Sequence, residues 1–374
     1  MLTRNLLTPV KDDLAAKLVM LSGPRQVGKT TFSRQLGLTS QYLSFDDEDH
    51  RRILHAKTWD RSVDLVIFDE LHKKPKWKSW IKGVYDTEKR PPALLVTGSA
   101  RLDVFKRGGD SLAGRHHAYR LHPFSVAELA TQMSPQEAYD LLLRVGGFPE
   151  PFLSGSEQFA KRWRRSHIDR IIKEDLLDLE QVRQLKKIDL LVDLLSERVG
   201  GPVSLNSLAR DLEVSPHTIK HWIEILQTLY VIFVVPPYTG KLARSLLKES
   251  KIYFYDNGKV RNEPGARLEN LVACALLKDL QRGEDLRGEK NQLCYVRDRE
   301  KREVDFAVVR DGALERLIEV KTADDTFSKS LGYFQERLQP KEAIQVVGSL
   351  KTKASTPSMR MTTAVDFLVG LESS

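Results

Sequence analysis

The sequence lacks the features of a disulfide-rich, zinc-binding or membrane-spanning protein. Its 374 residues contain two cysteines, Cys274 and Cys294, which are too few for a disulfide framework or for a zinc site of their own. No apolar run approaches the roughly 18 to 20 residues that a membrane-spanning helix needs, and no signal peptide is visible at the N-terminus. We therefore expect a cytoplasmic protein that has no membrane partner.

The sequence also has no large excess of one charge. It contains 59 lysines and arginines against 51 aspartates and glutamates, a net charge of +8. This balance favours a polyanionic partner such as DNA, but it lacks the strong bias of an architectural DNA-binding protein. The chain is longer than one hydrophobic core usually organises, so we expect two to four domains.

What the sequence does contain is a phosphate-loop pattern, G-x-x-x-x-G-K-[ST], over residues 23–30. The apolar run 18–21 before it predicts a buried strand, and residues 31–36 can begin a helix. Two glycines let backbone N–H groups turn toward phosphates, a lysine neutralises the β- and γ-phosphates, and a threonine hydroxyl can bind Mg²⁺. The candidate nucleotide-binding residues are Gly23, Pro24, Arg25, Gln26, Val27, Gly28, Lys29 and Thr30. The structural alternative is a glycine-rich turn between a strand and a helix.

Apolar runs alternate with segments long enough for helices through the first 121 residues. The predicted strands cover residues 18–22, 41–45, 65–69, 93–98 and 117–121. This alternation predicts an α/β fold, with a parallel sheet, helices on both faces and ligands at the carboxyl ends of the strands. The third strand ends in Asp69 and Glu70, which we assign to Mg²⁺ binding and to polarising the attacking water. A solvated turn would also explain two acids at a strand end.

Two further residues are candidates for the same site. Ser99 follows the next predicted strand, where its hydroxyl can bond the γ-phosphate or the water, although a helix N-cap explains it equally well. Arg115 ends a polar, glycine-containing loop, which suits an arginine that reaches the nucleotide of a neighbouring subunit. That role requires a homo-oligomer, and an ordinary surface arginine is the alternative.

These motifs together resemble a known family. The phosphate loop, Phe-Asp-Glu-Leu-His at 68–72, Thr-Gly-Ser-Ala at 97–100 and Leu-Ala-Gly-Arg at 112–115 resemble the prokaryotic AAA-type ATPases that carry a C-terminal domain of unknown function. The resemblance covers essentially the whole chain. It implies a five-stranded P-loop core that uses ATP and Mg²⁺, with roles for Ser99 and Arg115 beside the loop residues. It implies no particular substrate.

A cationic helix is predicted over residues 159–173, which hold six lysines and arginines against one acid. Contact with phosphates and a solvated helix face are the two explanations of this excess.

A second module at residues 204–235 resembles a winged helix-turn-helix. A short amphipathic helix, a tight connection and a helix that starts at Ser215-Pro216 are followed by a β-rich segment. The outward residues of the second helix are His217, Lys220, His221 and Glu224. They lack the arginine or amide side chains that read bases, so we expect contact with a DNA backbone or with a protein.

A predicted hairpin near the C-terminus carries three chemically interesting residues. Residues 304–309 and 314–321 read as strands around residues 311–312. A two-residue loop would leave Asp305 and Glu319 on opposite faces of the hairpin. A three-residue loop would pair Asp305 with Glu319 and put Lys321 on the same face. We predict the three-residue loop, because in this comparison only that register forms a site.

An acid followed by Glu-x-Lys on the next strand, with a helical glutamate before both, resembles the PD-(D/E)xK nuclease superfamily. The glutamate is Glu269, which lies on the apolar side of a helix predicted at 267–280. The resemblance implies that Asp305 and Glu319 hold a second Mg²⁺ or Mn²⁺, that Glu269 assists, and that Lys321 positions or deprotonates the water. A structural cross-strand pair is the alternative.

The predictions combine into four parts. They are a P-loop AAA-type ATPase core at 1–130, a helical connector with the basic helix at 131–200, a winged helix-turn-helix at 201–258 and a nuclease-like α/β domain at 259–374. We expect an oligomeric, Mg²⁺-dependent ATPase that acts on DNA. One rival is a nucleotide-gated switch in signalling or defence whose C-terminal domain binds a partner without cleavage. A second rival is a DNA-binding scaffold whose ATPase governs occupancy.

Overall fold

The computed structural model describes residues 2–88, 92–98, 112–171, 184–239, 249–261, 263–324, 326–350 and 355–371. The chain divides into two compact units, Met1–His122 with Thr228–Tyr230, and Pro123–Gln227 with Val231–Ser374. Within the described ranges no helix is long and apolar enough to cross a membrane. The finer division into four parts remains a prediction.

The first unit contains a parallel five-stranded sheet with the strand order β2-β3-β4-β1-β5. Its strands are β1 (Leu18–Ser22), β2 (Ser40–Ser44), β3 (Leu65–Asp69), β4 (Ala93–Thr97) and β5 (His116–Arg120). All five residues of β1 are buried, which explains why this strand reads as a continuous apolar run instead of an alternating one. The predicted α/β fold with a parallel sheet is confirmed.

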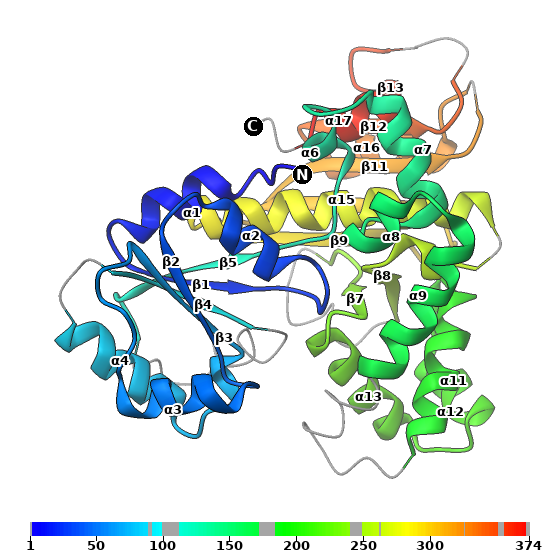
Figure 1. The fold of residues 1–374 in the computed structure, drawn as a ribbon. Coiled ribbons are helices and arrows are strands. Elements are labelled where there is room, and N and C mark those ends of the chain that lie inside the picture. The colour runs from blue at the N-terminus through cyan, green and yellow to red at the C-terminus, as the bar shows by residue number, and fades with distance from the viewer. Residues whose placement is uncertain are drawn as a thin grey trace. The chain divides into compact units, whose positions relative to one another are not determined.

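Helices cover both faces of this sheet (Figure 1). They are α1 (Leu7–Leu14), α2 (Lys29–Gln35), α3 (Glu48–Ala56) and α4 (Trp77–Thr87), with a short 3₁₀ turn, η1 (Leu71–Lys73), after β3. On one face Leu54 of α3 and Trp77 and Ile81 of α4 join Val66 and Phe68 of β3 in one core cluster. Burying each such side chain contributes roughly 1.5–3 kcal/mol, so this packing fixes the position of the strand end that carries Asp69.

The second unit begins with helices and a small antiparallel sheet. The helices are α6 (Val126–Leu129), α7 (Pro135–Val145), α8 (Pro149–Ser154), α9 (Glu157–Arg170), α11 (Leu185–Ser196), α12 (Leu205–Asp211) and α13 (Pro216–Thr228). The sheet has the order β6-β8-β7. Its strands are β6 (Pro202–Val203), β7 (Ile232–Val235) and β8 (Ser250–Phe254).

The predicted cationic helix corresponds to α9. It starts two residues before the predicted position, because the Ser156 side chain caps it by accepting a hydrogen bond from the Phe159 N–H. Trp163 and Arg164 on this helix are buried, so part of its charge lies inside the unit and not on a solvated face. Lys173, also assigned to this helix, lies outside the described residues.

The C-terminal part of this unit is a mixed five-stranded sheet with the order β13-β12-β11-β10-β9. Its strands are β9 (Asn291–Arg297), β10 (Glu303–Arg310), β11 (Ala313–Lys321), β12 (Glu342–Val347) and β13 (Arg360–Thr363). The accompanying elements are η4 (Asn257–Lys259), α15 (Pro264–Arg287), α16 (Lys329–Leu338) and α17 (Ala364–Val369). The helix predicted at 267–280 is longer at both ends in the structure, and α16 starts after Ser328, which caps it.

Candidate functional site

The phosphate loop connects β1 to α2, as its pattern predicts. Gly28 has a φ of 96° and ends the loop at the first turn of α2. Gly23 has a φ of 148°, and a Cβ at this position would lie 2.3 Å from the carbonyl oxygen of Leu121. Both positions therefore need glycine. Gly28 needs it for its positive φ, and Gly23 needs it both for its positive φ and for its close approach to Leu121.

Lys29 is buried in the loop that it closes. Its side chain is 8% exposed, and its Nζ donates hydrogen bonds to the carbonyl oxygens of Gly23 at 2.9 Å and Pro24 at 2.8 Å. Both of these partners are neutral carbonyl groups, and the ammonium also opposes the rise that burial causes in the pKa of the nearby Glu70. Phosphate oxygens are stronger acceptors than peptide carbonyls for such a cation, so the donor set fits a nucleotide's phosphates.

Asp69 ends β3 beside two hydroxyl groups. Its two carboxylate oxygens accept hydrogen bonds from Thr97 of β4 and Tyr42 of β2. The Tyr42 hydroxyl is also hydrogen-bonded to the Thr30 side chain, and burial together with Asp69 raises the pKa of Tyr42. Thr30 and Asp69, which the sequence assigns to one Mg²⁺, are therefore linked through one hydroxyl. Sequence reasoning did not single out Tyr42.

Glu70 directly follows Asp69, with a φ of 53° in the left-handed region. Its Oε2 lies 3.5 Å from His72 Nε2 and 3.8 Å from Lys73 Nζ. Burial and the neighbouring Asp69 raise the pKa of Glu70 to about 7, against the opposing effect of Lys29 and Lys73. A carboxyl group that titrates near neutrality can accept a proton from water at physiological pH.

The two softer predictions for this site, Ser99 and Arg115, both stay predictions. Ser99 lies outside the described residues. The guanidinium of Arg115 binds both carboxylate oxygens of Asp86 on α4, with Nε 2.8 Å from Oδ1. Arg115 would have to leave this ion pair to reach a neighbouring subunit's nucleotide, and that role stays a prediction.

The C-terminal hairpin has the predicted register at the site but not the predicted loop. Arg310 pairs with Ala313, which leaves a two-residue loop, and a bulge then shifts the register between Val308 and Val309. Beyond the bulge Phe306 pairs with Ile318. Asp305 therefore comes opposite Glu319, because the extra bulged residue restores the register that a plain two-residue loop would lose. The predicted three-residue loop is wrong.

A buried lysine occupies the centre of the predicted carboxylate site. Lys251 of β8 is fully buried, and its Nζ lies 3.1 Å from Glu269 Oε1, 2.9 Å from Glu303 Oε1 and 3.1 Å from Asp305 Oδ1. Burial opposes the charged form of Lys251, but the three carboxylates outweigh it and raise its pKa. The Tyr253 hydroxyl donates to Glu269 Oε1 at 2.6 Å. We call Lys251, Glu269, Glu303 and Asp305 the lysine–carboxylate cluster.

The described residues do not show the predicted second metal site of Glu269, Asp305 and Glu319, which stays a prediction. Among the described residues no group of three or more histidine, cysteine, aspartate or glutamate side chains is arranged to hold a metal ion. Lys251 pairs with Glu269 and Asp305, whereas Glu319 pairs with Lys321 at 2.7 Å. A Cβ on Gly200 would lie 2.7 Å from Glu269 Oε2, so backbone also closes in on the cluster.

Two acids of this region titrate far from their ordinary range. Burial and the nearby Asp305 raise the pKa of Glu269 to about 7, although Lys251 opposes the shift. The same two causes raise the pKa of Glu319 to about 7, against the effect of Lys321. Asp305 also accepts a hydrogen bond from the Val320 N–H at 2.9 Å. The predicted acids are thus close together, as expected, but they are held by lysines and backbone.

Comparison with known families divides the chain into three matched parts. Residues 15–130 match the AAA domain family. Residues 136–262 and 264–364 match two families described as domains of unknown function, DUF8612 and DUF4143. The family matches therefore assign an activity only to the N-terminal part.

Related proteins and structures add little about function. An uncharacterized protein of Mycobacterium tuberculosis is 28% identical over 247 residues, 65% of this chain and 55% of that protein. The chain thus spans about half the length of this relative. An uncharacterized protein of Methanocaldococcus jannaschii is 24% identical over 344 residues, covering 81% of this chain and 74% of that protein.

Solved structures that are similar include RuvB from Thermotoga maritima, with 18% identity and a TM-score of 0.31 over 62% of this chain and 89% of that one. A STAND protein with a tetratricopeptide repeat sensor from Pyrococcus horikoshii has 13% identity and a TM-score of 0.30. The match covers 77% of this chain and 48% of that protein. These similarities are too distant to carry an argument. The phosphate loop, its parallel sheet and the family match together make residues 15–130 an AAA-type P-loop ATPase domain.

Proposed function

We propose that the chain is a Mg²⁺-dependent, ATP-hydrolysing switch whose C-terminal domain binds a partner and does not cleave nucleic acid. The observation that carries this proposal is Lys251. Its ammonium lies within 3.1 Å of Glu269 and Asp305, two of the three acids that the nuclease resemblance assigns to a divalent cation, and 2.9 Å from Glu303. An ammonium can balance these charges but cannot polarise a phosphate ester as a bound divalent cation does.

The chemistry of the N-terminal site follows from its donor set. Lys29 would bind the β- and γ-phosphates, and Thr30 and Asp69 would hold Mg²⁺, which supplies charge stabilisation when it is bound. Glu70 would take the proton of the attacking water, since its pKa of about 7 makes it a base near physiological pH. Location in the cytoplasm remains a prediction from the sequence.

The proposal is tested by measuring ATP turnover and DNA cleavage in the same preparation. The full chain is incubated with single-stranded, double-stranded, forked, nicked and four-way DNA in Mg²⁺ or Mn²⁺. We expect ATP hydrolysis that Lys29→Ala abolishes and no metal-dependent DNA product. A product that both Asp305→Ala and Lys321→Ala remove, while Lys29→Ala alters only its ATP dependence, would overturn the non-cleaving assignment.

A DNA-stimulated ATPase is the second candidate, favoured by a cationic pocket next to the lysine–carboxylate cluster. The pocket of about 620 Å³ is lined by Tyr295, whose ring lies 5.6 Å from Lys251 Nζ, and by Tyr333. The guanidinium carbon of Arg302 lies 3.8 Å from the centroid of the Tyr333 ring, and that of Arg337 lies 4.6 Å from it. Arginine beside aromatic rings suits contact with phosphates and bases.

The helices α12 and α13 with the β6-β8-β7 sheet would provide a winged helix for the same partner, as the sequence predicts. Its exposed Lys220 lies 4.0 Å from Glu224 on the same helix, which reduces the cationic face that DNA would meet. One measurement distinguishes the DNA-stimulated ATPase from the switch. A rise in ATP turnover on adding DNA, lost at higher salt and reduced by Arg337→Ala, favours the DNA-stimulated enzyme, whereas unchanged turnover favours the switch.

A homo-oligomer remains part of the proposal through Arg115. Mixing Lys29→Ala subunits with Arg115→Ala subunits tests it, because each variant lacks a different half of a shared site. Recovered ATP turnover in the mixture supports an arginine that acts between subunits. No recovery, with a monomer in solution, contradicts it.

A further inference from the structure

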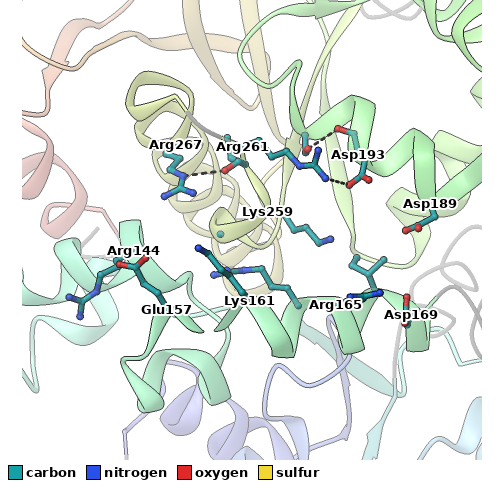
Figure 2. A pocket seen from close by; sticks show the side chains of 15 residues that line it. Arg144, Glu157, Lys161, Arg165, Asp169, Asp189, Asp193, Lys259, Arg261 and Arg267 are labelled. Atoms are coloured by element: carbon teal, nitrogen blue, oxygen red, sulfur yellow. Dashed lines mark hydrogen bonds and ion pairs between the residues drawn. The ribbon is translucent and has the colours of Figure 1, made fainter. Parts of the chain in front are cut away.

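A cavity of about 730 Å³ lies inside the second unit, away from the lysine–carboxylate cluster. Its walls come from α9 on one side, from α11 on another, and from the segment that joins η4 to the first turns of α15. Figure 2 shows Lys161 and Arg165 of α9 facing the segment that carries Lys259, Arg261 and Arg267. The volume is in the range of small-molecule sites, roughly 300–1,000 Å³.

The lining of this cavity is strongly polar and mostly cationic. Seven of its lining side chains are lysine or arginine, and four are aspartate or glutamate. An excess of positive charge in a concave, partly desolvated space raises the local concentration of anions. The question is which of these cations are used by the fold and which are available.

Two of the arginines are used by the fold. Arg164 is buried and its Nε lies 2.8 Å from Asp256 Oδ2, while a Cβ on Gly258 would lie 1.7 Å from its guanidinium. The guanidinium of Arg261 binds Asp193 at 2.7 Å and Glu197 at 3.2 Å. These ion pairs set the shape of the walls, and they occupy Asp193, one of the four acids.

Three other cations face the space without such partners. No residue within the described ranges forms a hydrogen bond or ion pair with the side chains of Lys161, Arg165 or Lys259. Lys259 is partly buried, and this burial, with the nearby Arg164, lowers the pKa of Lys259 in spite of nearby aspartates. A partly desolvated ammonium that no carboxylate directly pairs with is costly, and an anion bound in the cavity would offset that cost.

We propose that this cavity binds a small ligand of mononucleotide size that carries at least two phosphate groups. Two lysines and a guanidinium supply point charges and a planar fork, the donors that phosphates prefer. The carboxylates of Glu157, Asp169 and Asp189 also line the cavity. They would repel the continuous backbone of a nucleic acid, whereas a compact ligand can bind the cations and avoid them.

This ligand site does not depend on the proposed function, because it uses none of the residues that bind or hydrolyse ATP. The test uses the full chain with Lys29→Ala, so that the phosphate loop is impaired, and inorganic tripolyphosphate as the probe in isothermal titration calorimetry. We expect saturable binding that Lys259→Met weakens about tenfold, since a charge-assisted hydrogen bond is lost. Lys161→Met, on the exposed face of α9, should weaken it in the same direction.

The matched control is Lys220→Met, which removes one exposed positive charge from α13 in the same unit. It should leave tripolyphosphate binding unchanged. Circular dichroism confirms that each variant is folded. The proposal fails if tripolyphosphate does not bind, if Lys220→Met weakens binding as much as Lys259→Met, or if neither Lys259→Met nor Lys161→Met has an effect. It also fails if a single-stranded oligonucleotide binds the cavity better than tripolyphosphate does.

Discussion

Two buried lysines, Lys29 and Lys251, show how the same cation serves different purposes in the two units. Lys29 is 8% exposed and Lys251 is fully buried. Lys29 donates to two neutral carbonyl oxygens of its own loop, whereas Lys251 lies among three carboxylates. The first ammonium lies in the phosphate loop and acts on the nearby Glu70. The second is neutralised by the fold.

The comparison explains why a nuclease-like sequence pattern need not give a metal site. The hairpin brings together Asp305, Glu319 and Lys321, the pattern that resembles the nuclease superfamily. The positive charge beside Asp305 and its neighbours Glu269 and Glu303 comes from the ammonium of Lys251. A buried ion cluster of this kind is costly to break, because removing one partner leaves the others uncompensated.

The largest effect is expected for Lys251→Met. Removing the ammonium leaves Glu269, Glu303 and Asp305 facing one another in a buried place, and we expect the C-terminal sheet to lose about 3–5 kcal/mol of stability. Hydrogen exchange of the β10 and β11 amides in increasing urea measures it. Lys290→Met, which removes an exposed lysine of the same unit, should change little. Equal stability of the two variants would show that Lys251 does not hold the cluster together.

Lys29→Ala should lower the rate of ATP hydrolysis about 10²–10³-fold, because a preorganised donor to the phosphates is lost. The unfolding of the first unit should change far less, since the two carbonyl groups that accept from Lys29 are neutral and water can also satisfy them. Release of phosphate and thermal unfolding are measured together, with the exposed Lys11→Ala as the control. A large loss of stability with little loss of rate would make Lys29 structural, like Lys251.

The raised pKa of Glu269 predicts a pH dependence of stability. Its pKa is about 7 in the folded protein against an ordinary 4.5, so folding favours the neutral acid. The contribution of Glu269 to stability is therefore present in full below about pH 4.5, and about 3 kcal/mol of it is lost as the pH rises through about 7.

Glu269→Gln isolates this contribution, because the amide oxygen can still accept from Tyr253 and Lys251. Between pH 5 and 8 the wild-type protein should lose stability relative to this variant, as measured by urea midpoints at each pH. The exposed Glu336→Gln is the matched control. A constant difference across this range would mean that Glu269 is already ionised at pH 5.

The sequence was sufficient to predict those features whose residues are close together along the chain. The phosphate loop, the start of α2 and the acids at the end of β3 follow from local patterns, since one strand, one turn and one helix determine them. Only part of the hairpin geometry could be predicted from the sequence. The register at Asp305 is as expected, but the bulge between Val308 and Val309 has no signal in a pattern that assumes regular pairing.

The residues that were missed come from distant parts of the chain. Lys251 lies 54 positions before Asp305, and Tyr42 lies 27 before Asp69, so only tertiary packing brings them to their partners. A signal for Lys251 did exist. A lysine directly before the apolar run Ile252–Phe254 has to be paired if the strand is buried, and the acids of the hairpin were the available partners.

The smallest predicted effect concerns Tyr42, which connects the two proposed Mg²⁺ ligands. Tyr42→Phe removes the hydroxyl that donates to Asp69 and is bonded to Thr30. A net hydrogen bond contributes about 1 kcal/mol, so we expect the Mg²⁺ concentration for half-maximal ATP turnover to rise about fivefold. The matched control is Tyr119→Phe, which removes a hydroxyl that donates to Asp13 instead. If both variants raise the Mg²⁺ concentration for half-maximal turnover equally, or if neither does, Tyr42 does not orient the Mg²⁺ ligands. Contacts of Asp69 other than the one with Tyr42 would then hold its carboxylate in place.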